Sequence, residues 1–126
     1  MESPKKILVV EDSSLLRSVV VNALGDAGFL VIEAENGKEG LDVAKREHPD
    51  LIILDLIMPV MDGMEMYQQL REDAWGGAVP VIMLSATKDD KIASWLDSNK
   101  LDFFTKDNWM MDEVVLRVQK RLRIAA

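Results

Sequence analysis

The sequence contains no cysteine and only one histidine, His48. Without cysteine there is no disulfide framework and no thiolate metal site, which is compatible with a reducing cytoplasm. Long hydrophobic runs are also missing, because the first apolar segment, residues 7–10, meets Glu11 and Asp12 after four residues. That is too short for a signal peptide or a membrane span, so we expect a cytoplasmic domain.

Positive charge is scarce as well: 22 acidic residues stand against 15 Lys and Arg, a net charge of −7. Such a surface repels nucleic acid and anionic membranes, so we predict direct contact with neither. Hydrophobic residues make up 48% and charged residues 29% of the 126 residues, a composition typical of globular domains. We expect residues 1–126 to form a single domain that buries roughly two-thirds of its unfolded surface.

Short apolar runs alternate with segments of helical periodicity. The runs, rich in Val and Ile and typical of strands, are residues 7–10, 29–32, 51–54, 79–84 and 103–104. Helices are predicted between Ser13 and Gly28 and over residues 36–47, 63–73, 89–98 and 108–123. This order predicts an α/β fold, a flavodoxin-like doubly wound parallel sheet of five strands in the order 2-1-3-4-5 with five helices.

Polar residues stand where the predicted strands end. In a doubly wound sheet, ligands bind outside the carboxyl ends of the strands, here near the first and third strands. The residues that follow the apolar runs are Glu11, Asp12, Asp55, Ser85 and Lys106. We therefore expect three acids, a hydroxyl and an amine to gather at one edge of the sheet.

Three neighbouring carboxylates repel one another unless a cation lies among them. Mg²⁺ prefers oxygen ligands, whereas a soft or imidazole-rich site is excluded here, because His48 lies at the opposite end of the third strand. With Mg²⁺, Ser85 and Lys106 to hold phosphoryl oxygens, Asp55 could act as nucleophile and form an aspartyl phosphate.

Four motifs stand in this order along the chain: "ILVVED" (7–12), "LIILDLIMPVMDG" (51–63), "VIMLSA" (81–86) and "FFTK" (103–106). Together they make the sequence resemble the receiver domain of bacterial two-component response regulators, in the CheY-like superfamily. The resemblance implies a phosphoprotein switch that catalyses its own phosphorylation and dephosphorylation. Its donor would be a phosphohistidine on a sensor histidine kinase or a histidine phosphotransfer protein, and its output a downstream effector.

The resemblance also implies a role for each site residue. The metal ligands would be Glu11, Asp12, Asp55 and the backbone carbonyl of Ile57. Asp55 would accept the phosphoryl group, and Ser85 and Lys106 would bind its oxygens. Phe103 would be the switching aromatic of a surface formed by the fourth helix, fifth strand and fifth helix.

The sequence departs from the family pattern in three places. Asp107 follows Lys106 where the family usually has proline after a cis bond, and a cis bond before a non-proline residue costs about 3 kcal/mol. Asn99 and Lys100 replace a common Gly-Ala pair; we expect Asn99 to adopt the left-handed conformation and Lys100 to send its ammonium to water. Phe103 lacks the hydroxyl of the commoner tyrosine.

Other interpretations stay open. Glu11 and Asp12 could support the start of the following helix. The alternatives for the other candidates are a strand end for Asp55, a turn hydroxyl for Ser85, a surface lysine for Lys106 and a packing aromatic for Phe103. The departures favour, as an alternative function, a phosphate-independent interaction module on the same fold. A third possible function is that of a Mg²⁺-dependent hydrolase, but apolar Ile57 stands where such enzymes carry a second acid. Ile57 also offers no group to orient water, so we expect slow dephosphorylation.

Overall fold

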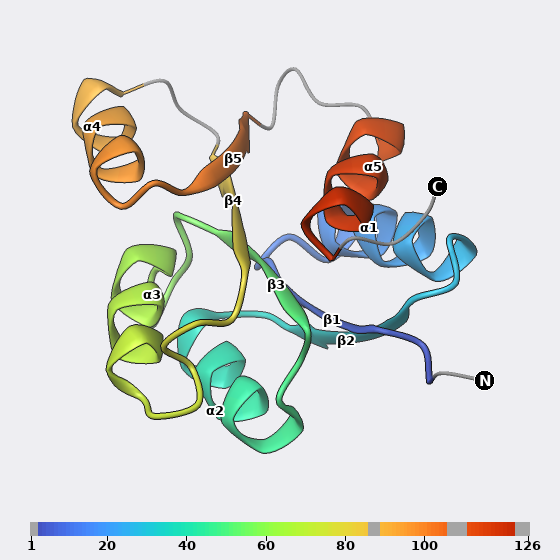
Figure 1. Ribbon diagram of the computed structural model, residues 1–126. Coiled ribbons are helices and arrows are strands. Elements are labelled where there is room, and N and C mark those ends of the chain that lie inside the picture. Colours follow the sequence, from blue (N-terminus) through green and yellow to red (C-terminus); the bar gives the residue numbers. More distant parts are fainter. Residues whose placement is uncertain (1–2, 86–88, 106–110, 123–126) are drawn as a thin grey trace.

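A computed structural model describes residues 3–85, 89–105 and 111–122 of the chain. Within these residues, strands and helices alternate as predicted (Figure 1). The strands are β1 (Lys6–Val10), β2 (Leu30–Ala34), β3 (Leu51–Asp55), β4 (Val81–Ser85) and β5 (Asp102–Thr105). The helices are α1 (Ser14–Asp26), α2 (Gly37–Glu47), α3 (Gly63–Glu72), α4 (Asp90–Ser98) and α5 (Met111–Arg121).

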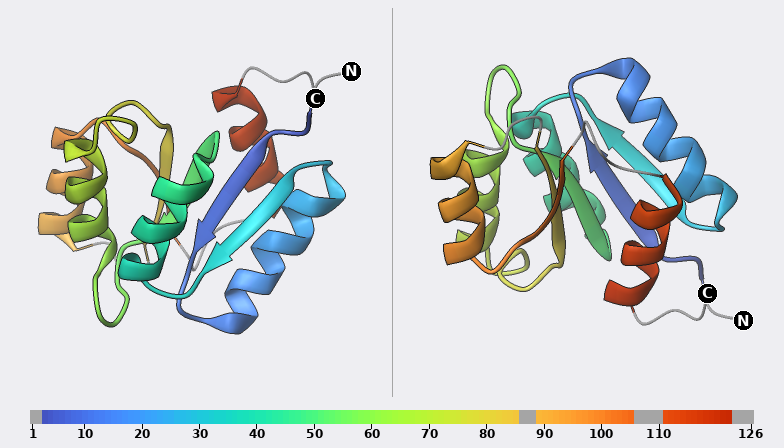
Figure 2. Two further views of the ribbon diagram at one scale, coloured as in Figure 1. Left: turned by 90° about the horizontal axis from the view of Figure 1, so that it is seen from below. Right: turned by 90° about the horizontal axis from the view of Figure 1, so that it is seen from above.

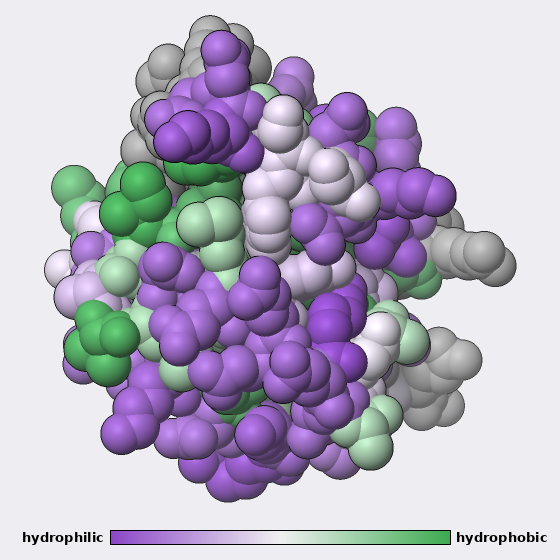
Figure 3. Space-filling model, turned by 90° about the vertical axis from the view of Figure 1, so that its left-hand side faces the viewer, coloured by the Kyte–Doolittle hydropathy of each residue, from purple (hydrophilic) through white to green (hydrophobic). Residues whose placement is uncertain are grey.

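The strands form one parallel sheet in the order β2-β1-β3-β4-β5, which confirms the predicted flavodoxin-like topology. Helices α1 and α5 cover one face, and α2, α3 and α4 cover the other (Figures 1 and 2). Seen from the side of α2, α3 and α4, the molecular surface is mainly hydrophilic (Figure 3). No helix in the described part of the chain is long and apolar enough to cross a membrane.

Strands β1 and β3 lie at the centre of the sheet and are almost wholly buried. Their alternate side chains pack into two separate clusters, because neighbouring residues of a strand point to opposite faces. The cluster under α2, α3 and α4 takes Leu8, Val10, Ile52 and Leu54, and the cluster under α1 and α5 takes Ile7, Val9, Leu51 and Ile53. Burial on both faces explains why these strands appear in the sequence as unbroken apolar runs.

The predicted helix starts are confirmed at the first three helices. The N-cap side chains that accept a hydrogen bond from the backbone N–H three residues on are Ser13, Asn36 and Asp62. Each satisfies one of the N–H groups that a helix leaves without an intrahelical partner. Helix α1 ends just before Gly28, whose φ is 96°.

The junction between α4 and β5 differs from the prediction. Asn99 has a φ of −93°, so the expectation that it adopts the left-handed conformation is wrong; exposed Lys100 adopts it instead, with a φ of 53°. The helix closes with Leu101 N–H donating to the Leu96 carbonyl at 3.0 Å and Lys100 N–H to the Asp97 carbonyl at 3.0 Å. This pattern is a Schellman motif, which places the left-handed residue one position later than expected.

Candidate acidic metal site

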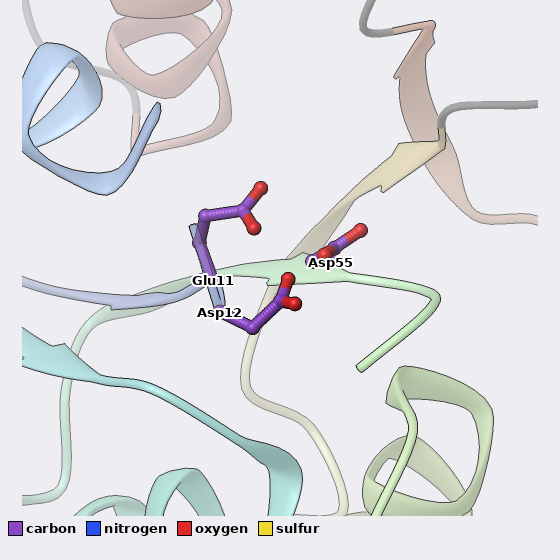
Figure 4. A group of neighbouring side chains, drawn as sticks. All are labelled: Glu11, Asp12 and Asp55. Carbon is purple, nitrogen blue, oxygen red and sulfur yellow. The ribbon is translucent and has the colours of Figure 1, made fainter. Parts of the chain in front are cut away.

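The carboxyl ends of β1 and β3 bring the three predicted acids together. Glu11 and Asp12 directly follow β1, and Asp55 ends β3. Because the two strands are neighbours in the sheet, the residues at their ends lie side by side. One carboxylate oxygen from each acid lies within 4.8 Å of the other two (Figure 4).

The acids differ in burial. Glu11 is 0% and Asp55 is 1% exposed, whereas Asp12 is exposed. Glu11 Oε2 accepts a hydrogen bond from Ser13 N–H at 3.0 Å, so Glu11 does support the start of α1. Its other oxygen, Oε1, is buried, as is Asp55 Oδ2. Two of the three carboxylates are therefore withdrawn from bulk water at the point where they converge.

This arrangement of carboxylates suits a hard cation. At an effective dielectric constant near 20, two unit charges 4.8 Å apart, the upper limit for these oxygens, repel each other by about 3.5 kcal/mol. Oxygen ligands on opposite sides of Mg²⁺ are about 4 Å apart, so the observed cluster is close to the size that the ion requires. The donors are all carboxylates, and His48 lies before β3, stacked on Trp75 with ring centroids 4.5 Å apart. The donor set thus fits Mg²⁺ rather than a softer metal.

The loop of residues 56–62 leaves the site and leads into α3. Leu56 extends the sheet pairing by donating its N–H to the Leu84 carbonyl at 3.0 Å, and Gly63 N–H closes the loop by donating to the Leu56 carbonyl at 2.8 Å. A Cβ at Gly63 would overlap with the carbonyl oxygen of Asp55. The loop holds Ile57, whose side chain is 59% exposed; the role of its carbonyl as a metal ligand stays a prediction.

The structure says less about the two phosphate-binding candidates. Ser85 ends β4 opposite Thr105 of β5, and its neighbour Leu84 pairs with Asp55, so the Ser85 backbone lies at the same edge as the acids. Its side chain, like Lys106 and Asp107, lies outside the described residues. The roles of Ser85 and Lys106, and the geometry of the bond between Lys106 and Asp107, therefore stay predictions.

Comparison with known protein families agrees with the site. The model of the response regulator receiver domain matches residues 7–119. The chain belongs to this family. The receiver domain is 42% identical over 121 residues to the KDP operon transcriptional regulatory protein KdpE of Escherichia coli, which covers 94% of this chain and 50% of KdpE. It spans about half the length of the curated relatives it matches.

Solved structures agree with the assignment to the receiver family. The receiver domain resembles the chemotaxis protein CheY4 of Vibrio cholerae with a TM-score of 0.85 and 28% identity, over 94% of this chain and 98% of CheY4. A chain of the CheX-CheY-BeF3-Mg complex of Borrelia burgdorferi gives a TM-score of 0.84 and 25% identity, over 94% of this chain and 90% of that chain. Receiver domains of two-component systems bind Mg²⁺ at an acidic pocket and interact with histidine kinases and effectors.

Arg17 of the receiver domain contacts the site but was not found by sequence reasoning. Its Nη1 donates to the Glu11 carbonyl at 2.7 Å, and its Nε donates to Glu33 Oε1 at 3.0 Å. It thereby fastens the end of β1 to α1 and β2. The sequence does contain a signal for this role: Arg17 lies near the N-terminus of a helix, where a cation is unfavourable unless a specific acceptor binds it.

Phe103 of the receiver domain lies on β5 with its side chain 41% exposed. It lines a surface pocket of about 440 Å³ together with residues of α4, including Asp97, and with Leu101. Arg117 of α5 donates to the Phe103 carbonyl at 3.2 Å. The predicted switch residue therefore stands between α4 and α5, and its switching stays a prediction.

Proposed function

We propose that Asp55 accepts a phosphoryl group from a phosphohistidine of a histidine kinase or phosphotransfer protein, in a Mg²⁺-dependent reaction. The observation that carries this proposal is the convergence of Asp55, 1% exposed, with Glu11 and Asp12 at the end of two central strands. We propose further that residues 1–126 form a single receiver domain. A cytoplasmic location stays a prediction.

In this mechanism, an Asp55 carboxylate oxygen attacks phosphorus and the phosphorus–nitrogen bond of the donor breaks. The electron pair of that bond stays with the imidazole nitrogen of the leaving histidine. Such transfers need positioning and charge neutralisation more than covalent help from the protein. Glu11, Asp12, Asp55 and the Ile57 carbonyl would hold Mg²⁺, which when bound would neutralise negative charge between the acids and the phosphoryl oxygens.

Two further residues would bind the product. The Ser85 hydroxyl would donate one hydrogen bond to a phosphoryl oxygen, and the Lys106 ammonium would pair with another. Ile57 has an exposed apolar side chain and offers no group to orient an attacking water. We therefore propose slow self-dephosphorylation; a phosphoryl lifetime of seconds or less would contradict this.

The phosphoryl group would act on the surface formed by α4, β5 and α5. It adds charge and acceptor oxygens at the strand ends, which biases a two-state element towards one arrangement. Phe103, half-exposed beside α4, is the proposed moving part. A downstream effector would recognise the resulting surface.

The rival function, a phosphate-independent interaction module, is less well supported. Lys100 is one of the departures from the family pattern that favour such a module. It is exposed and lies in an ordinary helix-ending turn, so it does not disturb the fold. A phosphate-independent module would also have no need of the acidic cluster, which is complete in this chain.

The two functions are separated by incubating the chain with acetyl phosphate or phosphoramidate and Mg²⁺ and measuring its intact mass. We expect one added phosphoryl group in the wild type, and none in Asp55→Asn or when EDTA removes Mg²⁺. Asp42→Asn, which changes an exposed acid on α2, is the matched control and should be phosphorylated normally. A wild type without any adduct at saturating donor would overturn the proposal and favour the interaction module.

A further inference from the structure

The loop of residues 56–62, between β3 and α3, is fastened to the first turn of α2. Gly37, the first residue of α2, donates its backbone N–H to the Met61 carbonyl at 3.0 Å. This N–H belongs to the first turn of a helix, where it has no intrahelical acceptor. The same loop carries Ile57, the predicted backbone ligand of the metal, so a contact made by α2 reaches the site.

The contact leaves no room for a side chain at Gly37. A Cβ there would overlap with the Met61 carbonyl oxygen and would lie 3.0 Å from both the carbonyl carbon and Cγ of Met61. Because the obstacle is mostly backbone, a rotamer change of Met61 cannot relieve it. Any larger residue at position 37 therefore has to push α2 and the loop apart.

Moving helix α2 away from the loop would open buried packing. Three residues along it, a Cβ at Gly40 would lie 2.9 Å from Val10 Cγ2 and 3.0 Å from Met66 Sδ. Val10 and Met66 are both fully buried, so a shift of α2 away from β1 and α3 would leave a gap in the core, which is costly. The loop carries the exposed side chains of Ile57 and Val60, so we expect a side chain at position 37 to displace the loop rather than the helix.

The loop itself is strained and needs an external contact. Met61 N–H donates to the Pro59 carbonyl at 2.8 Å, and Val60 between them has a φ of 70°, the geometry of a γ-turn. A β-branched residue rarely adopts this conformation, which persists only where the surroundings hold it. The Val60 side chain is 77% exposed and cannot supply that support, whereas the hydrogen bond from Gly37 to the next carbonyl can.

We propose that Gly37 is a positioning residue of the metal site. Its N–H holds the Met61 carbonyl and fixes the loop where the Ile57 carbonyl joins Glu11, Asp12 and Asp55. The inference rests on the proposed function, and it adds that α2, which contributes no ligand, sets the affinity for Mg²⁺.

The test is Gly37→Ala, with Mg²⁺ affinity measured by calorimetric titration. We expect binding to weaken about tenfold, the effect typical of residues that hold metal ligands in place. The matched control is Gly25→Ala in α1, where a Cβ would meet nothing within 4 Å, so the affinity should not change. Equal affinity of Gly37→Ala and the wild type would overturn the inference and leave the proposed function intact; a wild type that binds no Mg²⁺ would overturn both.

A second measurement needs no variant, and it decides the matter if Gly37→Ala does not fold. Coupling between two contacts is reciprocal, so Mg²⁺ must strengthen the hydrogen bond as much as the hydrogen bond strengthens Mg²⁺ binding. In the wild type, hydrogen exchange of the Gly37 amide should slow about tenfold at saturating Mg²⁺. An exchange rate that Mg²⁺ leaves unchanged would contradict the positioning role.

Discussion

Asp55→Asn should stabilise the metal-free receiver domain and at the same time remove its stabilisation by Mg²⁺. The substitution removes one of two buried carboxylates that lie within 4.8 Å of each other. Two unit charges at 4.8 Å repel by about 3.5 kcal/mol, and loss of the other interactions of Asp55 offsets part of this, so we expect a gain of about 1–2 kcal/mol in the free energy of unfolding. For the wild type, Mg²⁺ at ten times its dissociation constant should add about 1.4 kcal/mol.

Thermal unfolding followed by circular dichroism, with Mg²⁺ and with EDTA, checks both parts. Asp42→Asn removes an exposed acid and should keep the Mg²⁺ response of the wild type. If Asp55→Asn were less stable than the wild type in EDTA, or gained as much from Mg²⁺, the acidic cluster would not be a cation site of the kind described.

Gly63→Ala should destabilise the domain by about 3 kcal/mol, the upper range for overpacking in a core. The added Cβ would overlap with the Asp55 carbonyl oxygen and lie 2.9 Å from Leu56 Cα. Both neighbours are backbone in a strand and turn that are almost fully buried, so neither can move aside. The hydrogen bond from Gly63 N–H to the Leu56 carbonyl, 2.8 Å long, would be stretched as well.

Urea unfolding measures this loss directly. Gly77→Ala is the control, because a Cβ there would meet only the carbonyl oxygens of Arg71 and Asp73, both at 3.8 Å. Its free energy of unfolding should change by less than about 0.5 kcal/mol. A Gly63→Ala variant as stable as Gly77→Ala would mean that α3 can shift away from β3.

The sequence was sufficient for the topology and for the acidic cluster, because both follow from short-range patterns. Unbroken apolar runs mark strands buried on both faces, and the ends of neighbouring parallel strands must meet at one edge. Glu11, Asp12 and Asp55 therefore came together as expected. Strand ends were less predictable: β2 continues to Ala34 through polar Glu33, since pairing with β1 extends along the backbone whatever the side chain is.

Most of what the sequence missed depends on contacts between different elements, and only the end of α4 was decided by local hydrogen bonds. Arg17 has its role through acceptors on β1 and β2, and Gly37 through the Met61 carbonyl, 24 positions away. The left-handed residue after α4 is Lys100 rather than Asn99, because the pattern of carbonyls that closes the helix decides its place. None of these contacts changes the spacing of hydrophobic residues from which the helices and strands were predicted.

The central claim is that Asp55 is the carboxylate that accepts phosphorus. The most direct measurement is to phosphorylate the wild type, reduce it with borohydride, which converts an acyl phosphate into an alcohol, and sequence the peptides by mass spectrometry. We predict conversion of the carboxyl group at position 55 alone. Conversion at Glu11 or Asp12, or none at position 55 in a chain that carries the added phosphoryl mass, would contradict it.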